Sequence, residues 1–381
     1  MKINRRNLIA FGTLALLAGC KVIPKGVPDV PPPPVDVPSA STLPTDAQRH
    51  RVALLVPLSG PNGAVGQSIA NASTMALLDT NAANLRITTY DTAGGVPAAA
   101  AKAIADGNRL ILGPLASEDI IAVAATARPA RVPVISYASS SLSTARDIFI
   151  MGNIAGQSIA RSVAYAKAHG ATRFAALIPT GDYGRLAASA LQSAVRQSGG
   201  TMAAVETYDR ANTSVASAVR RLREKGGYDA VLIADGARIA AQAAPLIKAG
   251  GATPRIIGTE LWSGEAAVGS VPALRGAIFA AVADTRFRQF AESYKTRFGA
   301  QPYRLATLGY DSVLLTLRVA RDWRPGTSFP TARLADTGGF LGLDGPFRFG
   351  SSGVIERSLE VREARAGGAT VVSPAPARFE D

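Results

Sequence analysis

Short apolar segments alternate with helical segments through most of the chain after residue 50, and this alternation restricts the fold more than any other feature. The first four segments rich in Val, Ile and Leu lie at 52–56, 85–90, 110–112 and 132–135. Ala-rich segments of helical composition lie between them, at about 65–80, 97–106 and 117–128. Continuous apolar strands linked by helices are typical of parallel sheets covered on both faces. The chain is therefore predicted to be an α/β protein.

The pattern then occurs a second time, after a break near Gly152-Asn153. Strand-like segments lie at 174–178, 202–205, 230–233 and 255–257, with helical segments at about 184–198, 213–225 and 237–249. Right-handed crossovers wind each series into its own sheet. We therefore expect two doubly wound parallel-sheet lobes joined by a hinge of several crossing segments. Ligands of such sheets bind at the carboxyl ends of the strands, which here can face each other across a cleft.

The first nineteen residues have the layout of an export signal. Lys2, Arg5 and Arg6 precede an apolar stretch at 8–18, which is too short to span a membrane. The stretch ends in Leu17-Ala18-Gly19-Cys20, which resembles the bacterial lipobox and contains the only cysteine of the chain. This resemblance implies that Cys20 is acylated and holds the protein on a membrane. By the same resemblance, Lys21 after the cysteine favours the outer membrane, with the protein facing the periplasm.

Residues 20–46 form a proline-rich segment, which we expect to be an extended tether between the lipidated Cys20 and the α/β body. The sequence carries 41 Lys and Arg against 28 Asp and Glu, a formal net charge of +13. Such a charge is compatible with nucleic acid, anionic lipid or an acidic envelope polymer. The arginines are scattered and no nucleic-acid motif is present, so no nucleic-acid partner is expected.

Several motifs resemble the type I periplasmic-binding protein superfamily, the group that includes leucine-binding proteins. They occur in the superfamily's order: Val52-Ala53-Leu54-Leu55-Val56-Pro57-Leu58-Ser59-Gly60, Gly66-Gln67-Ser68, Tyr90-Asp91-Thr92, Leu112-Gly113-Pro114-Leu115-Ala116-Ser117, Val132-Pro133-Val134-Ile135-Ser136, Asp182-Tyr183-Gly184 and Gly309-Tyr310-Asp311-Ser312. The Pro-Leu-Ser-Gly, Tyr-Asp-Thr and Gly-Pro-Leu motifs look most like penicillin-binding protein activator lipoproteins. That resemblance implies a non-catalytic partner of a peptidoglycan synthase. The well-known activators carry a helical-repeat domain where this chain has only the tether, so the alternative is a receptor for an amino acid or related solute that feeds an ABC permease or a sensor.

The resemblance also implies where a ligand would lie. Donors on the first lobe would hold a carboxylate, and acids on the second lobe would meet an ammonium group. The candidate residues, each near a strand end, are Ser59, Ser117, Ser136, Ser139, Tyr183, Asp235 and Glu260, with Ser140 beside Ser139. The competing interpretation is that these side chains only cap helices or close turns.

Catalysis, metal binding and a bound cofactor are not expected. His50 and His169 are the only histidines, and neither follows a plausible nucleophile in the predicted layout. One cysteine and two histidines also provide too few ligands for a Cys/His metal site. Gly60, Gly63 and Gly66 do not have the spacing of a dinucleotide-binding loop.

The chain is expected to cross between the lobes more than once on its return. Lobe one is assigned 51–152 plus about 279–335, and lobe two 153–278 plus about 340–366. Within this return, 286–300 and 304–321 have helical patterns. Segments 345–349 and 355–362 alternate as an antiparallel pair. The remainder, 367–381, is expected to be a loose tail.

Overall fold

The computed structural model describes residues 48–139, 145–211 and 214–379. The signal peptide, Cys20, the tether and Ser140 lie outside these ranges, so the expectations about them remain predictions. Within the described ranges, no helix is both long and apolar enough to cross a membrane.

The first lobe is built on a five-stranded parallel sheet in the order β2-β1-β3-β4-β5. Its strands are β1 (His50–Val56), β2 (Leu85–Asp91), β3 (Leu110–Leu112), β4 (Val134–Ser136) and β5 (Ile148–Ile150). The connecting helices are α1 (Gly63–Asp79), α2 (Val96–Ala105) and α3 (Ile120–Ala127). Alternate residues of β1 enter two different core clusters, Val52 and Leu54 one and Ala53 and Leu55 the other. Both faces of the sheet are therefore covered, as the continuous apolar strands predict.

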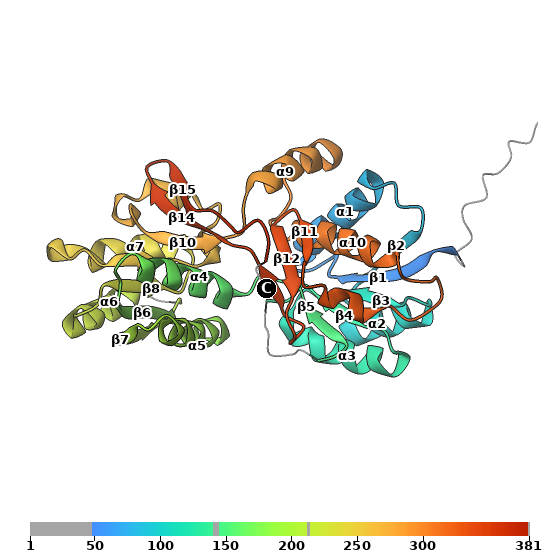
Figure 1. The fold of residues 1–381 in the computed structure, drawn as a ribbon, viewed down its shortest axis with the longest axis horizontal. Helices are drawn as coiled ribbons and strands as arrows, with labels where there is room; N and C mark the ends of the chain where they lie inside the picture. Colours follow the sequence, from blue (N-terminus) through green and yellow to red (C-terminus); the bar gives the residue numbers. More distant parts are fainter. Residues whose placement is uncertain (1–47, 140–144, 212–213, 380–381) are drawn as a thin grey trace, which may run out of the picture. The chain divides into compact units, whose positions relative to one another are not determined.

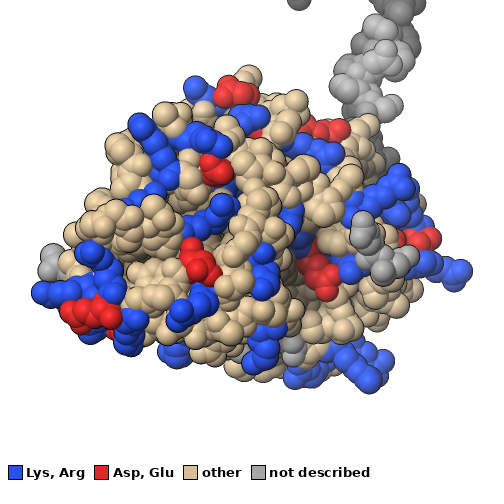
Figure 2. All heavy atoms as spheres, turned by 60° about the vertical axis from the view of Figure 1, so that its left-hand side comes forward, with Lys and Arg blue, Asp and Glu red and all other residues tan. Residues whose placement is uncertain are grey.

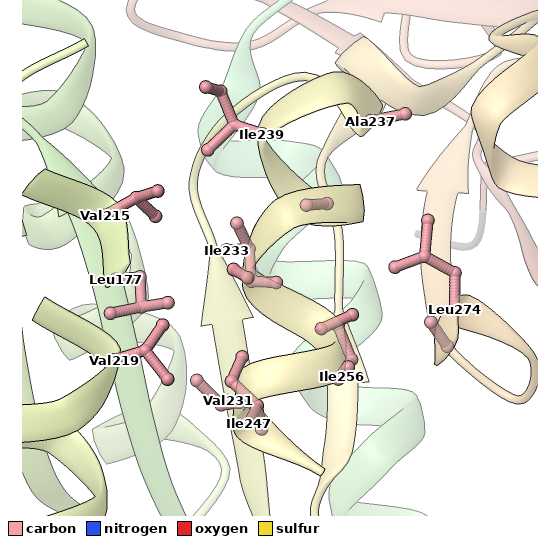
Figure 3. Packing of buried hydrophobic residues seen from close by; sticks show 14 of the residues in the cluster. Leu177, Val215, Val219, Val231, Ile233, Ala237, Ile239, Ile247, Ile256 and Leu274 are labelled. Atoms are coloured by element: carbon pink, nitrogen blue, oxygen red, sulfur yellow. The ribbon is translucent and has the colours of Figure 1, made fainter. Parts of the chain in front are cut away.

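The second lobe is built on a seven-stranded sheet in the order β15-β14-β10-β9-β8-β6-β7. Its strands are β6 (Arg173–Pro179), β7 (Thr201–Tyr208), β8 (Ala230–Ile233), β9 (Arg255–Ile257), β10 (Ile278–Ala281), β14 (Glu360–Arg365) and β15 (Gly368–Ser373). The helices are α4 (Ala155–Ala168), α5 (Asp182–Gln197), α6 (Ser214–Lys225), α7 (Ala237–Ile247) and α8 (Ala266–Ser270). On one face, Val215 and Val219 of α6 pack with Leu177 of β6 and Val231 of β8 (Figure 3).

The two strand series therefore form two separate sheets, which confirms the predicted pair of α/β lobes (Figure 1). Each lobe also contains a glycine where the helix that follows its first strand approaches the end of that strand. A Cβ on Gly66 of α1 would lie 1.7 Å from the Pro57 carbonyl oxygen, and one on Gly184 of α5 would lie 1.8 Å from that of Pro179. Only glycine permits this close approach. The same requirement explains the glycine in both the Gly-Gln-Ser and the Asp-Tyr-Gly motifs.

The returning chain differs in detail from the sequence-based boundaries. It contains α9 (Thr285–Phe298), α10 (Ala306–Ala320), β11 (Phe340–Gly342), β12 (Gly345–Phe349) and β13 (Ile355–Arg357). β10 belongs to the second lobe's sheet, whereas Phe347, Phe349 and Ile355 pack in the first lobe's core. The assignments of 279 onward to lobe one and of 340 onward to lobe two are therefore wrong at these strands. The expected loose tail is also wrong for 368–373, because β15 pairs with β14.

Three short segments cross between the lobes, 151–154, 282–284 and 358–359. A group of buried charges lies beside them. Arg357, at the end of β13, donates from Nη2 to the Met151 carbonyl at 3.0 Å and lies 3.9 Å from Asp344. Asp344 lies 2.8 Å from Arg304 and accepts a 2.9 Å hydrogen bond from the hydroxyl of Thr307 on α10. The buried Arg357 therefore links the crossing segment that begins at Met151 to the charged group of the first lobe.

Asp311, in the Gly-Tyr-Asp-Ser motif of α10, is fully buried near this charged group. Its Oδ1 accepts the Leu343 N–H at 2.7 Å, while its Oδ2 has no hydrogen-bond partner among the described residues. Burial first, and then the nearby Asp344 carboxylate, raise the pKa of Asp311 to about 7, against the opposing effect of Arg357. Arg304 is a further cation of the same group, facing Arg357. The Asp311 carboxyl is therefore a proton-binding group inside the first lobe.

We expect the stability of the protein to fall as pH rises toward neutrality because of Asp311. The unfolded carboxyl titrates near pH 4, so between about pH 4 and 7 the folded chain holds the extra proton. One proton corresponds to a slope of at most about 1.4 kcal/mol per pH unit. Chemical denaturation of Asp311→Asn at several pH values should show a flatter pH dependence than the parent. Asp322→Asn, at an exposed ion pair with Arg333, should keep the parent slope; an equal slope in Asp311→Asn would contradict the assignment.

Candidate functional site

The carboxyl edge of the second lobe's sheet brings Tyr183 and Glu260 together. Tyr183 lies in the first turn of α5, directly after β6, and Glu260 begins a 3-10 turn (Glu260–Trp262) after β9. Parallel strands place both at the same edge. The Tyr183 hydroxyl donates to Glu260 Oε1 at 3.2 Å. Glu260 Oε2 is buried and has no hydrogen-bond partner among the described residues. Half of this carboxyl is therefore unpaired.

Asp235, after β8, lies in the same group but is already paired. Its Oδ2 accepts hydrogen bonds from the Tyr208 hydroxyl at 2.6 Å and from Arg210 Nε at 2.7 Å, and its Oδ1 accepts the Gly236 N–H at 2.8 Å. The Arg210 guanidinium lies 5.6 Å from the centre of the Tyr183 ring. Because the guanidinium neutralises Asp235, the acid left to meet a ligand cation is Glu260.

Burial determines the protonation of this group. It raises the pKa of the Glu260 carboxyl, with the Tyr183 hydrogen bond acting in the opposite direction. Burial is likewise the main cause that raises the pKa of Tyr183, with the Glu260 charge adding to it, and that of Tyr208, with the Asp235 hydrogen bond adding to it. Both phenols are therefore neutral donors. An ammonium group beside Glu260 would favour the ionised carboxylate.

The four serines predicted on the first lobe follow its strand ends but are not equivalent. Ser136 is fully buried, and its hydroxyl donates to the Pro114 carbonyl at 3.0 Å and accepts the Ala138 N–H at 3.1 Å. Both interactions are internal to the protein, and contact between Ser136 and a ligand stays a prediction. Ser117 is partly buried, and Ser59 and Ser139 are exposed. These three remain predicted ligand contacts.

Asp91 organises the loop around Ser59. Its Oδ1 accepts the backbone N–H groups of Leu58 at 2.8 Å and Ala93 at 2.9 Å. These two bonds, and a weaker one from the Ser59 hydroxyl, lower the pKa of Asp91. The Tyr-Asp-Thr motif therefore has a structural use, which is to hold the end of β2 against the loop after β1.

Sequence reasoning missed two residues of this group, Tyr208 and Arg210. The second strand of lobe two is predicted at 202–205, but β7 continues to Tyr208. Residues at the true end of the strand were therefore not considered as edge residues. Trp262 was missed as well; its Nε1 donates to the Asp235 carbonyl at 2.9 Å, and its ring is fully buried. Extending the predicted strand to Tyr208 would have identified Tyr208 and Arg210 as residues at the strand end.

Neither histidine lies beside an activated hydroxyl in the part of the chain that the structure describes. His50 stacks on Trp323 with ring centres 4.2 Å apart. His169 is exposed at the end of α4, where its Nδ1 contacts the Tyr165 carbonyl at 2.7 Å and its ring stacks on Tyr165. Both positions are those of packing or capping residues.

The comparisons with known proteins agree with this geometry. The family model described as periplasmic binding protein matches residues 50–369. An uncharacterized protein of Rickettsia prowazekii (strain Madrid E) is 25% identical over 173 residues, which is 45% of this chain and 46% of that protein. The match thus spans about half of the relative's length.

Solved structures of binding proteins share the fold at low sequence identity. A branched chain amino acid ABC transporter periplasmic ligand-binding protein from Burkholderia xenovorans LB400 has a TM-score of 0.71 and 15% identity, covering 86% of this chain and 96% of that one. The branched-chain amino acid transporter substrate binding protein LivJ from Streptococcus pneumoniae, in complex with isoleucine, has a TM-score of 0.60 and 20% identity. The match covers 86% of this chain and 100% of that one. A solute binding protein of an ABC transporter from Rhodopseudomonas palustris BisB5, in complex with 3,4-dihydroxy benzoic acid, has a TM-score of 0.64 and 20% identity. The match covers 87% of this chain and 98% of that one.

Two helix-covered sheets, joined by three crossings and carrying polar groups at their carboxyl edges, define a two-lobe α/β binding protein with the type I periplasmic-binding fold. The chain belongs to the periplasmic binding protein family, whose model matches most of its length. The expected superfamily and fold class are thereby confirmed. Membership of this family implies a periplasmic location.

Proposed function

We propose that the protein is a non-catalytic receptor for a small solute that carries both an ammonium and a carboxylate group, as amino acids do. The observation that carries this proposal is the buried Glu260 carboxyl, which has one oxygen on Tyr183 and the other unpaired. A buried carboxylate without a partner is costly, and a ligand cation would supply one. This is the alternative function stated from the sequence, and it has better support than the activator role.

The first lobe supplies the complementary chemistry. Ser117 and Ser139 follow β3 and β4 at the carboxyl edge of its sheet, and their hydroxyls can donate to a ligand carboxylate. In this arrangement, Glu260 selects for the ammonium end, Tyr183 orients Glu260, and the first lobe holds the acid end. The Arg210–Asp235 pair supports the pocket wall without contacting the ligand charge.

The ligands of the solved neighbours suggest how to test this selection. Isoleucine and 3,4-dihydroxy benzoic acid, bound in two of them, both carry a carboxylate, but only isoleucine carries an ammonium group. If Glu260 is the ammonium partner, this chain should bind amino acids in preference to benzoates. Calorimetric titration of the full chain with a panel of both kinds measures the preference directly.

Glu260→Gln should weaken binding of the amino acid found in that panel by roughly tenfold to a hundredfold. A hydrogen bond to a charged group contributes about 1.5–3 kcal/mol, and the variant keeps the shape while removing the charge. Glu265→Gln is the matched control, because Glu265 is exposed and five residues further along the chain. Equal affinities in the two variants, or tighter binding of benzoate than of any amino acid, would contradict the role given to Glu260.

The activator role remains a prediction from motif resemblance. No contact among the described residues supports a penicillin-binding protein as partner, and none supports an ABC permease specifically. Crosslinking in cells followed by affinity purification separates the two: recovery of a peptidoglycan synthase favours the activator, and recovery of a permease favours the receptor. Attachment to the outer membrane through acylated Cys20 is also a proposal, which intact-mass measurement and membrane fractionation test.

A further inference from the structure

A cavity of about 160 Å³ lies at the opposite end of the first lobe's sheet from the candidate ligand site. Its wall includes Arg49, His50 and Arg51 at the start of β1, Arg109 just before β3, and Trp323 after α10. These positions are the amino ends of the strands, whereas Ser59, Ser117 and Ser139 follow the carboxyl ends. The cavity is therefore separate from the site described above.

The charge in this cavity is entirely positive. Three arginines line it, and no carboxylate does. Within the described ranges, no Asp or Glu forms an ion pair with any of the three. Asp106, three residues before Arg109, accepts from Arg51 only through its backbone carbonyl, at 3.1 Å. The Asp106 carboxylate instead accepts hydrogen bonds from Tyr90 at 2.9 Å and Lys102 at 3.2 Å. The cavity thus lacks an internal counter-charge.

Buried polar atoms at this cavity are also unpaired. His50 is 3% exposed, and its Nδ1 has no hydrogen-bond partner. Arg49 Nε is buried and equally without a partner. A buried polar group without a partner costs about 1–3 kcal/mol, so natural structures rarely keep two of them together unless something else satisfies them.

His50 gives the cavity a rigid wall. Its ring stacks on Trp323 at 4.2 Å, and Trp323 in turn packs edge-on against Phe329 at 5.1 Å. Burial lowers the pKa of His50, so the imidazole is neutral at pH 7 and has one N–H to donate. Neutral imidazole beside three guanidinium groups avoids a fourth positive charge while still providing a donor.

We propose that this arginine cavity binds a phosphate-type oxyanion, either free phosphate or the phosphate of a lipid headgroup. Arginine presents a planar fork of donors that fits phosphate oxygens in pairs. The volume is several times the roughly 30 Å³ that one water occupies in the liquid, which leaves room for a tetrahedral anion. In the sequence, Arg49 follows the predicted tether, residues 20–46, by only three residues, so a lipid headgroup is one of the two sources to test.

The test compares two sources of the same chemistry on the full chain. Inorganic phosphate is titrated by calorimetry in a phosphate-free buffer. Co-sedimentation then compares vesicles of phosphatidylcholine alone with vesicles of equal parts phosphatidylcholine and phosphatidylglycerol, so that any membrane anchor contributes equally to both. Phosphate binding without preference for the anionic vesicles supports a free oxyanion, and preference for the anionic vesicles supports a headgroup. Absence of both overturns the proposal.

Variants assign the binding to the cavity. Arg49→Gln combined with Arg109→Gln should weaken binding at least about tenfold, because each lost charged hydrogen bond contributes roughly 1.5–3 kcal/mol. Arg109→Lys keeps the charge but loses the fork, so an intermediate loss is expected. Arg196→Gln, at an exposed arginine of the second lobe, removes the same kind of charge elsewhere and should have little effect. Thermal melts without ligand verify folding, and an equal loss in Arg196→Gln would show that only overall charge matters.

Discussion

Replacing Asp344 with asparagine is expected to lower the free energy of unfolding by about 3–5 kcal/mol. Asp344 is 1% exposed and lies 2.8 Å from Arg304 and 3.9 Å from Arg357. The arginine at 357 is almost fully buried, with its Nε and Nη1 already lacking hydrogen bonds. Burial also lowers the pKa of Arg357, while the two nearby carboxylates raise it. Loss of the Asp344 charge would leave this buried cation poorly compensated, which urea denaturation measures.

Glu356→Gln is the matched control for this variant. Glu356 also accepts from an arginine at 2.8 Å, but its side chain is 46% exposed, and exposed ion pairs contribute only about 0–1 kcal/mol. A loss for Asp344→Asn no larger than that for Glu356→Gln would show that the buried charges beside the crossings are dispensable. The comparison separates burial from pairing, because the two carboxylates lie at similar distances from their arginines.

Trp262→Ala should destabilise the second lobe by about 3–5 kcal/mol. The indole is fully buried, 5.9 Å from the Phe279 ring, and donates to the Asp235 carbonyl at 2.9 Å. It also packs so closely on the backbone that a Cβ at Gly258 would lie 2.3 Å from its ring. Truncation would leave a cavity beneath the strand ends that carry Asp235 and Glu260. Thermal and urea unfolding report the loss, and solute titration reports its effect on the site.

Trp262→Phe separates packing from hydrogen bonding. Phenylalanine fills most of the space but leaves the Asp235 carbonyl without its donor, so a smaller loss of about 1–3 kcal/mol is expected. If the alanine and phenylalanine variants unfold at the same denaturant concentration, the cavity term assigned to the indole is wrong. If both equal the parent, Trp262 has no part in supporting the site.

Lys and Arg are scattered over the face shown in Figure 2, with fewer groups of Asp and Glu among them, and most of that face is neither. This agrees with the sequence-based view that the arginines form no single stripe. Arg221 illustrates the reason, because its guanidinium donates to Glu206 at 2.6 Å and Lys225 pairs with the same carboxylate. Arg220 and Arg223 of the same helix donate to the Ser217 hydroxyl at 3.4 Å and the Ala249 carbonyl at 3.0 Å, so these arginines are engaged locally.

Apolar periodicity was sufficient to predict most of the secondary structure. Val215, Ala218, Val219 and Leu222 are all buried on α6, as their spacing requires, and β3 and β8 have the predicted bounds. The helical pattern at 286–300 corresponds to α9, and Phe290 and Tyr294 of this helix pack with Ala72 and Met75 of α1. These features depend on local spacing, which a single sequence contains.

Features that depend on distant pairing could not be predicted in the same way. β15 lies in the segment expected to be a loose tail, and it is a strand because β14 lies beside it. Ser136 ends β4, so its position alone suggests a donor to a ligand at the edge of the sheet. Its hydroxyl instead donates to the Pro114 carbonyl. Likewise, only the fold shows that Arg210 pairs with Asp235, whereas Glu260 keeps one oxygen, Oε2, without a partner among the described residues. Side-chain pairing across strands is a property of the tertiary structure, so strand-end position alone selects too many candidates.

The packing of α10 against α1 has a consequence for how the protein is made. α1 is among the first elements to be synthesised, but the helix that covers it comes only after β6 to β10 of the second lobe have been made. A partly synthesised first lobe therefore lacks a wall of its own core. Contacts between such distant segments slow folding, because the long intervening loop must close first. For a polypeptide destined for the periplasm, we expect this late closure to leave the core of the first lobe incomplete, and the chain competent for secretion, until α10 has been made.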